Sequence, residues 1–63
     1  MDSPVTVREG RIFWRGYYKH PLDAKLLADA FESTPKDDWY APILFQYAAD
    51  LRAAIKQLET VDA

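Results

Sequence analysis

The stretch that decides the fold runs from Gly10 to Pro21 and reads Gly-Arg-Ile-Phe-Trp-Arg-Gly-Tyr-Tyr-Lys-His-Pro. It contains both glycines of the chain and four of its nine aromatic residues. Aromatic residues favour strands and glycine favours turns. Pro21 is suited to the first turn of a helix. The stretch therefore predicts a strand that ends where a helical segment begins.

The residues before this stretch predict a first strand that pairs with it. Residues 5–8 alternate apolar and polar side chains, which is the pattern of a half-buried strand. Glu9 and Gly10 then form a two-residue turn, because glycine accepts the positive φ that such turns need. This turn sets the register: Arg8 pairs with Arg11, Val7 with Ile12, Thr6 with Phe13, and Val5 with Trp14. The face expected to point to the core therefore carries Val5, Val7, Ile12 and Trp14.

Gly16 allows two geometries for the end of the second strand. This strand is predicted to run from Arg11 to about Tyr18, so that the hairpin covers about residues 5–18. A glycine inside a strand often marks a bulge, and a bulge exchanges the faces of the residues that follow it. The geometry at Gly16 thus decides whether Tyr17 or Tyr18 points away from the core.

Two helices are predicted after the hairpin. Pro21 favours a helix over about 21–33, and its apolar side is formed by Leu22, Leu26, Leu27, Ala30 and Phe31. A helical turn is expected at about 35–40. A longer helix is expected at about 42–59, because a proline such as Pro42 is excluded from a helix interior. The apolar seam of this second helix is Leu44, Ala48, Leu51, Ile55 and Leu58.

These elements predict the α+β class, with an N-terminal two-stranded hairpin packed on two antiparallel helices. The order is β-β-α-α, and the second helix is the longer one. A chain of 63 residues has no room for a second core, so we expect a single small domain over residues 1–63.

The composition and the apolar segments predict where the protein is located and whether it associates with other chains. The chain has no cysteine, which excludes disulfides and thiolate metal sites. Its first residues lack the basic start and apolar segment of a signal peptide, and its longest apolar run, 39–45, is too short to cross a bilayer. We therefore expect a cytoplasmic protein with no membrane partner. Because 49% of so short a chain is apolar, a homodimer or an obligate partner is also expected.

The sequence contains no recognisable catalytic or metal-binding pattern. His20 is the only histidine, and no serine or cysteine is placed to act with it as a nucleophile. The adjacent carboxylates Asp37 and Asp38 lack the further spaced oxygen ligands of a calcium loop. The glycines are too far apart for a phosphate-binding loop. We therefore predict no enzyme activity, no catalytic residue, no metal and no cofactor.

The outward side of the hairpin is the predicted partner-binding surface. Its side chains are basic or aromatic: Arg8, Arg11, Phe13, Arg15, Tyr17 and Lys19. Arginine and aromatic residues are enriched at binding hot spots, and they also form stacking surfaces for single-stranded nucleic acid. The structural alternative is that helices or a dimer mate cover the rings. Trp39 and Tyr40 are a secondary partner-binding candidate, although capping of the core is the favoured interpretation for this pair.

Two functional hypotheses follow, and both have the hairpin as the binding element. The first is a small protein-protein interaction module, such as an inhibitor, adaptor or assembly factor, a type of product that mobile elements often encode. The second rests on element order, since strand, helix, helix is similar to the ribbon-helix-helix class of dimeric regulators. That resemblance implies nucleic-acid reading through strand 11–18, by Arg11, Phe13, Arg15 and Tyr17. The net charge of −2 ranks a protein partner above nucleic acid, because DNA-binding domains are usually basic.

Overall fold

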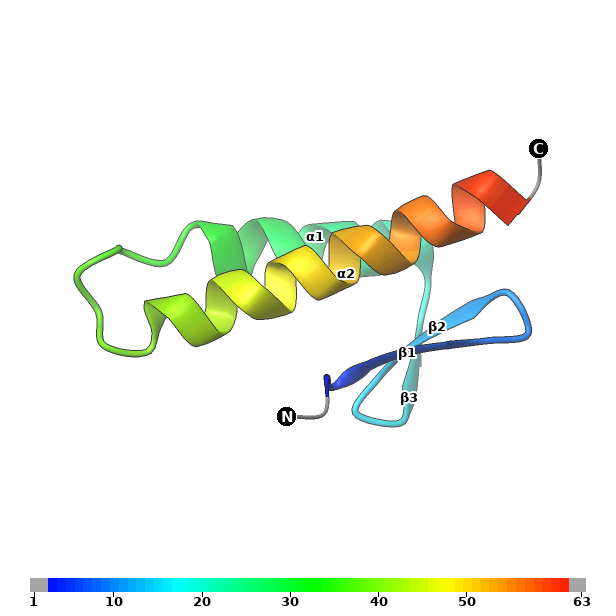
Figure 1. Cartoon of the computed structure of the whole chain (residues 1–63), viewed down its shortest axis with the longest axis horizontal. Coiled ribbons are helices and arrows are strands. Elements are labelled where there is room, and N and C mark those ends of the chain that lie inside the picture. The colour runs from blue at the N-terminus through cyan, green and yellow to red at the C-terminus, as the bar shows by residue number, and fades with distance from the viewer. Residues whose placement is uncertain (1–2, 62–63) are drawn as a thin grey trace.

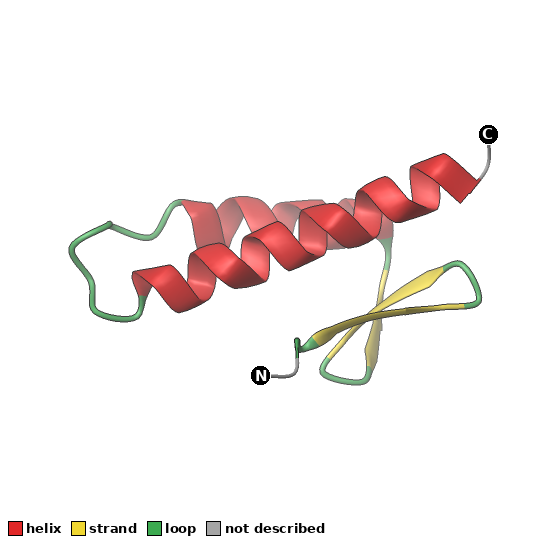
Figure 2. Cartoon of the chain, in the orientation of Figure 1, coloured by secondary structure: helices red, strands yellow, loops and turns green. Residues whose placement is uncertain are grey.

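The computed structural model describes residues 3–61, which form a three-stranded antiparallel sheet followed by two helices (Figures 1 and 2). In chain order the elements are β1 Val5–Arg8, β2 Arg11–Trp14, β3 Tyr17–Lys19, α1 Pro21–Glu32 and α2 Ala41–Val61. The predicted α+β class is confirmed, and α2 is the longer helix. The expected two-stranded hairpin has a third strand. Of the predicted domain 1–63, residues 1–2 and 62–63 lie outside the described residues.

The two helices lie side by side and antiparallel, and the sheet packs against only part of their length (Figure 1). The sheet lies beneath the start of α1 and the C-terminal half of α2. The loop that joins α1 to α2 is at the opposite end of the molecule, which is 39 Å long. That end therefore has no sheet to cover it.

The pairing of β1 with β2 follows the predicted register. Val7 lies opposite Ile12 and Val5 lies opposite Trp14. Glu9 and Gly10 have φ angles of +53° and +74°, as a primed two-residue turn requires. Such turns match the right-handed twist of the strands they join. The register predicted from the turn and the alternating pattern is confirmed.

The continuous strand predicted from Arg11 to Tyr18 is wrong, because a second tight turn divides it. Arg15 and Gly16 have φ angles of +50° and +87°, and β3 then turns back along β2. Gly16 therefore belongs to a turn and not to a bulge. Tyr17 lies opposite Trp14 and Tyr18 lies opposite Phe13, so Tyr18 shares the outward face with Phe13.

We expect Gly16→Ala to destabilise the protein by about 1–2 kcal/mol, because in the left-handed region the Cβ of an L-residue lies too close to the following carbonyl oxygen. A Cβ at this position would meet no atom within 4 Å, so the cost arises from the backbone alone. Asn tolerates positive φ better, and Gly16→Asn should lose less. Urea unfolding of the two variants measures the difference. Equal stability of Gly16→Ala and the natural chain would refute the turn.

Helix α1 is started by His20 and Pro21. The His20 Nδ1 accepts a hydrogen bond from the Leu22 backbone N–H at 3.1 Å, so this histidine caps the helix. The apolar side predicted for α1 is only partly correct. Leu27 and Phe31 pack on the core, but Leu22 and Leu26 are 67% and 65% exposed. The fully buried residues of α1 are instead Ala24 and Ala28.

The α1–α2 connection contains two successive turns rather than the expected helical turn at 35–40. The Asp38 N–H donates to the Pro35 carbonyl, and the Ala41 N–H donates to the Asp38 carbonyl. Helix α2 begins at Ala41, so Pro42 lies in its first turn, where its missing N–H costs no helical bond. The predicted seam of α2 is confirmed: Ala48 and Leu51 are buried, and Leu44, Ile55 and Leu58 are half-buried.

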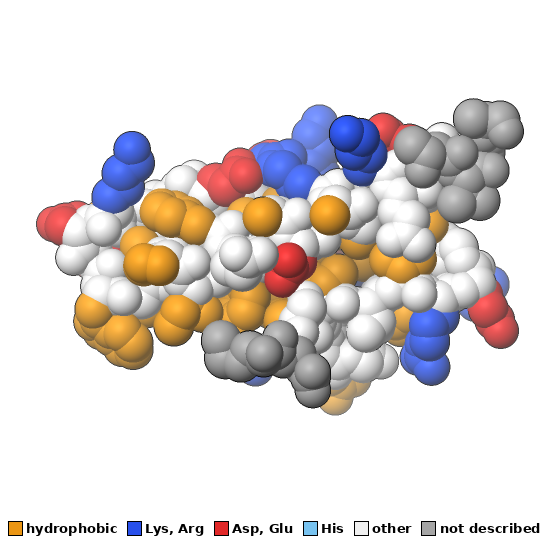
Figure 3. Space-filling view, in the orientation of Figure 1, with side chains coloured by type: hydrophobic (Ala, Val, Ile, Leu, Met, Phe, Trp, Pro, Cys, Tyr) orange, Lys and Arg blue, Asp and Glu red, His pale blue; other side chains and the backbone are white. Residues whose placement is uncertain are grey.

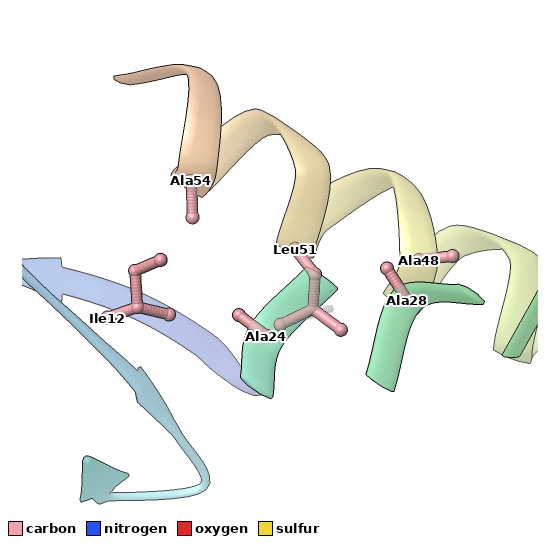
Figure 4. Close-up of a cluster of buried hydrophobic side chains, with 6 residues drawn as sticks. All are labelled: Ile12, Ala24, Ala28, Ala48, Leu51 and Ala54. Carbon is pink, nitrogen blue, oxygen red and sulfur yellow. The ribbon is translucent and has the colours of Figure 1, made fainter. Parts of the chain in front are cut away.

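The core is small and made mostly of alanine. Ile12 and Leu51 are the only large side chains among the described residues that are fully buried. Around them lie Ala24, Ala28, Ala48 and Ala54 (Figure 4). Beside this cluster, the Trp14 ring lies 5.5 Å from both Phe31 and Tyr47, measured between ring centroids. This aromatic cluster joins β2 to both helices.

Candidate interaction surface

The outer face of the sheet is the side turned away from the helices. Because side chains alternate along each strand and paired residues share a face, this side is defined by Thr6, Arg8, Arg11, Phe13 and Tyr18. The Phe13 and Tyr18 rings make an edge-on contact with centroids 6.2 Å apart. Phe13 is half-buried and Tyr18 is exposed. The outer face therefore offers an aromatic pair between basic side chains.

The two arginines of the outer face carry uncompensated positive charge. The Arg8 guanidinium lies over the Phe13 ring, 4.7 Å from its centroid. Arg11 lies directly opposite Arg8 in the ladder, which places like charges side by side. Within residues 3–61, neither arginine forms an ion pair, and Glu9 in the adjoining turn is the nearest acid along the chain. A negatively charged group bound here would relieve the repulsion between the two guanidinium groups.

The structure brings together only half of the six residues predicted for this surface. Arg8, Arg11 and Phe13 share the outer face, and Tyr18 replaces the predicted Tyr17 beside them. Tyr17 lies opposite Trp14 and Lys19 lies opposite Ile12, so both belong to the helix-facing side of the sheet. Arg15 lies in the second turn, with its guanidinium 5.6 Å from the Trp14 ring centroid. The second turn, which the sequence pattern did not predict, is the cause of this separation.

Trp39 and Tyr40 form a second exposed aromatic group at the far end of the molecule. Their rings meet edge to face at 5.5 Å, and Trp39 is 82% exposed. The favoured interpretation that they cap the core is therefore wrong, because the α1–α2 loop carries them away from the sheet. The Tyr40 hydroxyl donates to Asp38 Oδ2 at 3.0 Å, and this bond to a carboxylate raises the pKa of Tyr40. Figure 3 shows hydrophobic side chains gathered at this end.

The remaining charged groups with shifted pKa values have a structural role. Arg52 of α2 donates to both Glu32 carboxylate oxygens and to Asp29, which ties α2 to the end of α1. The hydrogen bonds from Arg52 lower the pKa of Glu32. The same bonds raise the pKa of Arg52, so this guanidinium stays charged.

No site for a metal or a membrane span is found within residues 3–61. No three or more histidine, aspartate or glutamate side chains of this part gather in a way that could hold an ion. Neither described helix is both long enough and apolar enough to cross a bilayer. Comparison with protein-family models, with curated protein sequences and with solved structures gave no match to this chain.

Proposed function

We propose that this protein is a non-enzymatic protein-interaction module whose outer face binds an acidic surface of another protein. The observation that carries the proposal is the pair Arg8 and Arg11, which lie side by side without a carboxylate between them. Arg8 is held on Phe13 and is therefore partly ordered before binding. A guanidinium that is already oriented loses less conformational entropy when it pairs with a carboxylate.

The position of Arg8 also favours a protein over single-stranded nucleic acid. A stacking surface needs an aromatic ring whose flat face is open to a base. The face of Phe13 is occupied by the Arg8 guanidinium, which leaves the exposed Tyr18 as the one open ring of the outer face, whereas successive bases stack on successive rings. The ribbon-helix-helix alternative needs one continuous reading strand at 11–18, whereas these residues form β2, a turn and β3. An acidic protein surface needs neither an open ring nor a longer strand.

Charge reversal tests this function. We expect Arg11→Glu to reduce recovery of the protein partner about tenfold or more, because hot-spot substitutions cost at least ~2 kcal/mol. Lys36→Glu makes the same charge change on the exposed α1–α2 connection, and it should leave recovery unchanged. The measurement is capture of partners by the tagged protein from nuclease-treated lysate, with circular dichroism to confirm that both variants fold.

Two outcomes would count against the proposal. Equal loss of the partner in both variants would indicate a general charge effect rather than a site on the outer face. Capture that disappears with nuclease treatment and weakens steeply with salt would indicate that the outer face binds nucleic acid instead of protein.

A further inference from the structure

Strand β1 is an open edge of the sheet. The order β1-β2-β3 leaves one side of β1 without a neighbouring strand. The Arg15 N–H donates to the Pro4 carbonyl at 2.8 Å, so Pro4 and Arg15 form a hydrogen-bonded pair of the antiparallel ladder. Bonded and non-bonded pairs alternate along such a ladder. Val5 and Val7 are therefore non-bonded residues whose N–H and C=O groups point outward, away from β2.

Helix α2 lies beside this edge, and the two elements enclose an open groove of about 270 Å³. Ser3, Val5 and Val7 line the strand side, and the helix side is lined by Asp50, Ala53, Ala54 and Gln57. The short alanine side chains keep the space between helix and strand open. Figure 3 shows hydrophobic side chains along the junction of α2 with the sheet. The groove thus combines a lining that is partly apolar and partly polar with outward backbone hydrogen-bonding groups of β1.

Ser3 shows what the open edge can bind. Its hydroxyl accepts a hydrogen bond from the Val5 N–H at 3.1 Å and donates to Asp50 Oδ2 at 2.9 Å. A side-chain oxygen of this chain therefore occupies one position where the carbonyl of a neighbouring strand would bind. Within residues 3–61, the outward N–H and C=O of Val7 have no such partner.

We propose that the groove between β1 and α2 binds an extended peptide segment of a partner protein as a fourth strand. A fourth strand would bond to the outward N–H and C=O of Val7 and, by displacing the Ser3 hydroxyl, to the Val5 N–H, as in other cases of strand addition to a sheet edge. Alternate side chains of that segment face the groove, where the two valines and two alanines of the lining favour small apolar ones. The cavity volume fits a few such side chains and excludes a folded element.

The charge of the groove selects a basic side chain in the bound segment. Among the described residues that line the groove, Asp50 is the only charged one. Its two carboxylate oxygens accept bonds from neutral donors, Ser3 and the Gln46 side chain, and no cation of residues 3–61 pairs with it. A Lys or Arg flanked by small apolar residues complements this lining. A second copy that pairs through β1 with its helices on the same side of the sheet would present Val5 and Val7 to the groove, without a cation.

This site is separate from the outer face. Val5 and Val7 point to the helix side of the sheet, whereas Arg8 and Arg11 point to the other side. The proposal therefore does not depend on the proposed function, and either can fail alone.

The test uses a synthetic peptide, acetyl-Thr-Val-Thr-Lys-Thr-Val-Thr-amide, in which valine and lysine alternate with threonine and can share one face. We expect the peptide to shift the amide NMR signals of Val5 and Val7 in the full chain. Replacing its lysine by glutamate should weaken binding about tenfold, since a like charge would then face Asp50. Ala53→Phe fills the groove from the exposed side of α2 and should abolish binding, whereas Arg11→Glu should not alter it.

Several results would overturn the proposal. These are the absence of any shift at Val7 with millimolar peptide, equal binding of the lysine and glutamate peptides, and unchanged binding by a folded Ala53→Phe variant. Sedimentation that shows a dimer lost on Ala53→Phe would assign the groove to a second copy of the chain.

Discussion

Leu51→Ala is expected to unfold a large fraction of the protein at room temperature. Removing a buried leucine side chain costs about 3–5 kcal/mol, which includes the cavity that is left behind. A single core in a chain of this size supplies only about 3–5 kcal/mol of net stability. Leu51 shares its fully buried position with one other large side chain, Ile12, and the alanines around it cannot fill the space. The loss therefore approaches the whole free energy of unfolding.

Leu26→Ala is the matched control for this experiment. It removes the same atoms from a leucine on the neighbouring helix that is 65% exposed. Surface substitutions usually change stability by less than about 0.5 kcal/mol. Urea or thermal unfolding followed by circular dichroism compares the two variants directly. Similar midpoints for Leu51→Ala and Leu26→Ala would show that the helices pack through different faces.

Trp14→Ala should produce a loss of similar size, about 3–5 kcal/mol. The Trp14 ring contacts Phe31 of α1 and Tyr47 of α2, both at 5.5 Å. Its truncation therefore removes the aromatic link between the sheet and both helices at once. Trp14→Phe keeps a ring in the cluster and should therefore lose less stability than Trp14→Ala. The remaining loss reflects the contacts of the larger indole that phenylalanine cannot make.

Trp39→Ala is the control for Trp14, because it removes the same side chain from a site that is 82% exposed. We expect a change below about 0.5 kcal/mol. Tryptophan fluorescence separates the two residues: a Trp39→Phe variant reports on Trp14 alone, and its emission should move to longer wavelength on unfolding. A Trp39→Ala variant as unstable as Trp14→Ala would mean that the α1–α2 loop packs on the core.

The first two strands could be predicted because several independent sequence signals indicate the same pairing there. The alternation over residues 5–8, a glycine in the turn and apolar residues at matching positions all specify one register. A shift by one residue would expose Val7 and bury Arg8. The same agreement specified the core face, and with it the three predicted residues that share the outer face, Arg8, Arg11 and Phe13.

The third strand was missed although the sequence carries a signal for it. Glu9-Gly10 and Arg15-Gly16 are both residue-glycine pairs, and four strand-forming residues separate them. The aromatic residues on both sides of Gly16 favoured a longer strand, and arginine is uncommon at positive φ. The turn then moved Tyr17 to the helix side of the sheet and Tyr18 to the outer face. One backbone reversal thus changed the composition of the candidate site.

The buried side of α1 could not be chosen from hydrophobicity. Leu22 and Leu26 are spaced like a core stripe, and so are Ala24 and Ala28 on another side of the same helix. The structure buries the alanines, because small side chains allow α1 and α2 to approach closely. Burying leucine instead of alanine would remove more apolar area from water, but the larger side chain would hold the two helices apart. Which side of α1 is buried depends on the side chains of α2, so it cannot be predicted from the sequence of α1 alone.

The order of the elements determines when this chain can fold during its synthesis. Neighbours in the sheet and in the helix pair are also neighbours in sequence, so the strands and the helical hairpin rely on local contacts that form fast. The contacts that join them link opposite ends of the chain, as between Ser3 and Asp50, which are 47 positions apart. Leu51 and Ala54 of α2 are made after the whole sheet and α1. The nascent chain therefore lacks a complete core until α2 has been synthesised, and the sheet stays exposed to chaperones and to other strands until α2 docks.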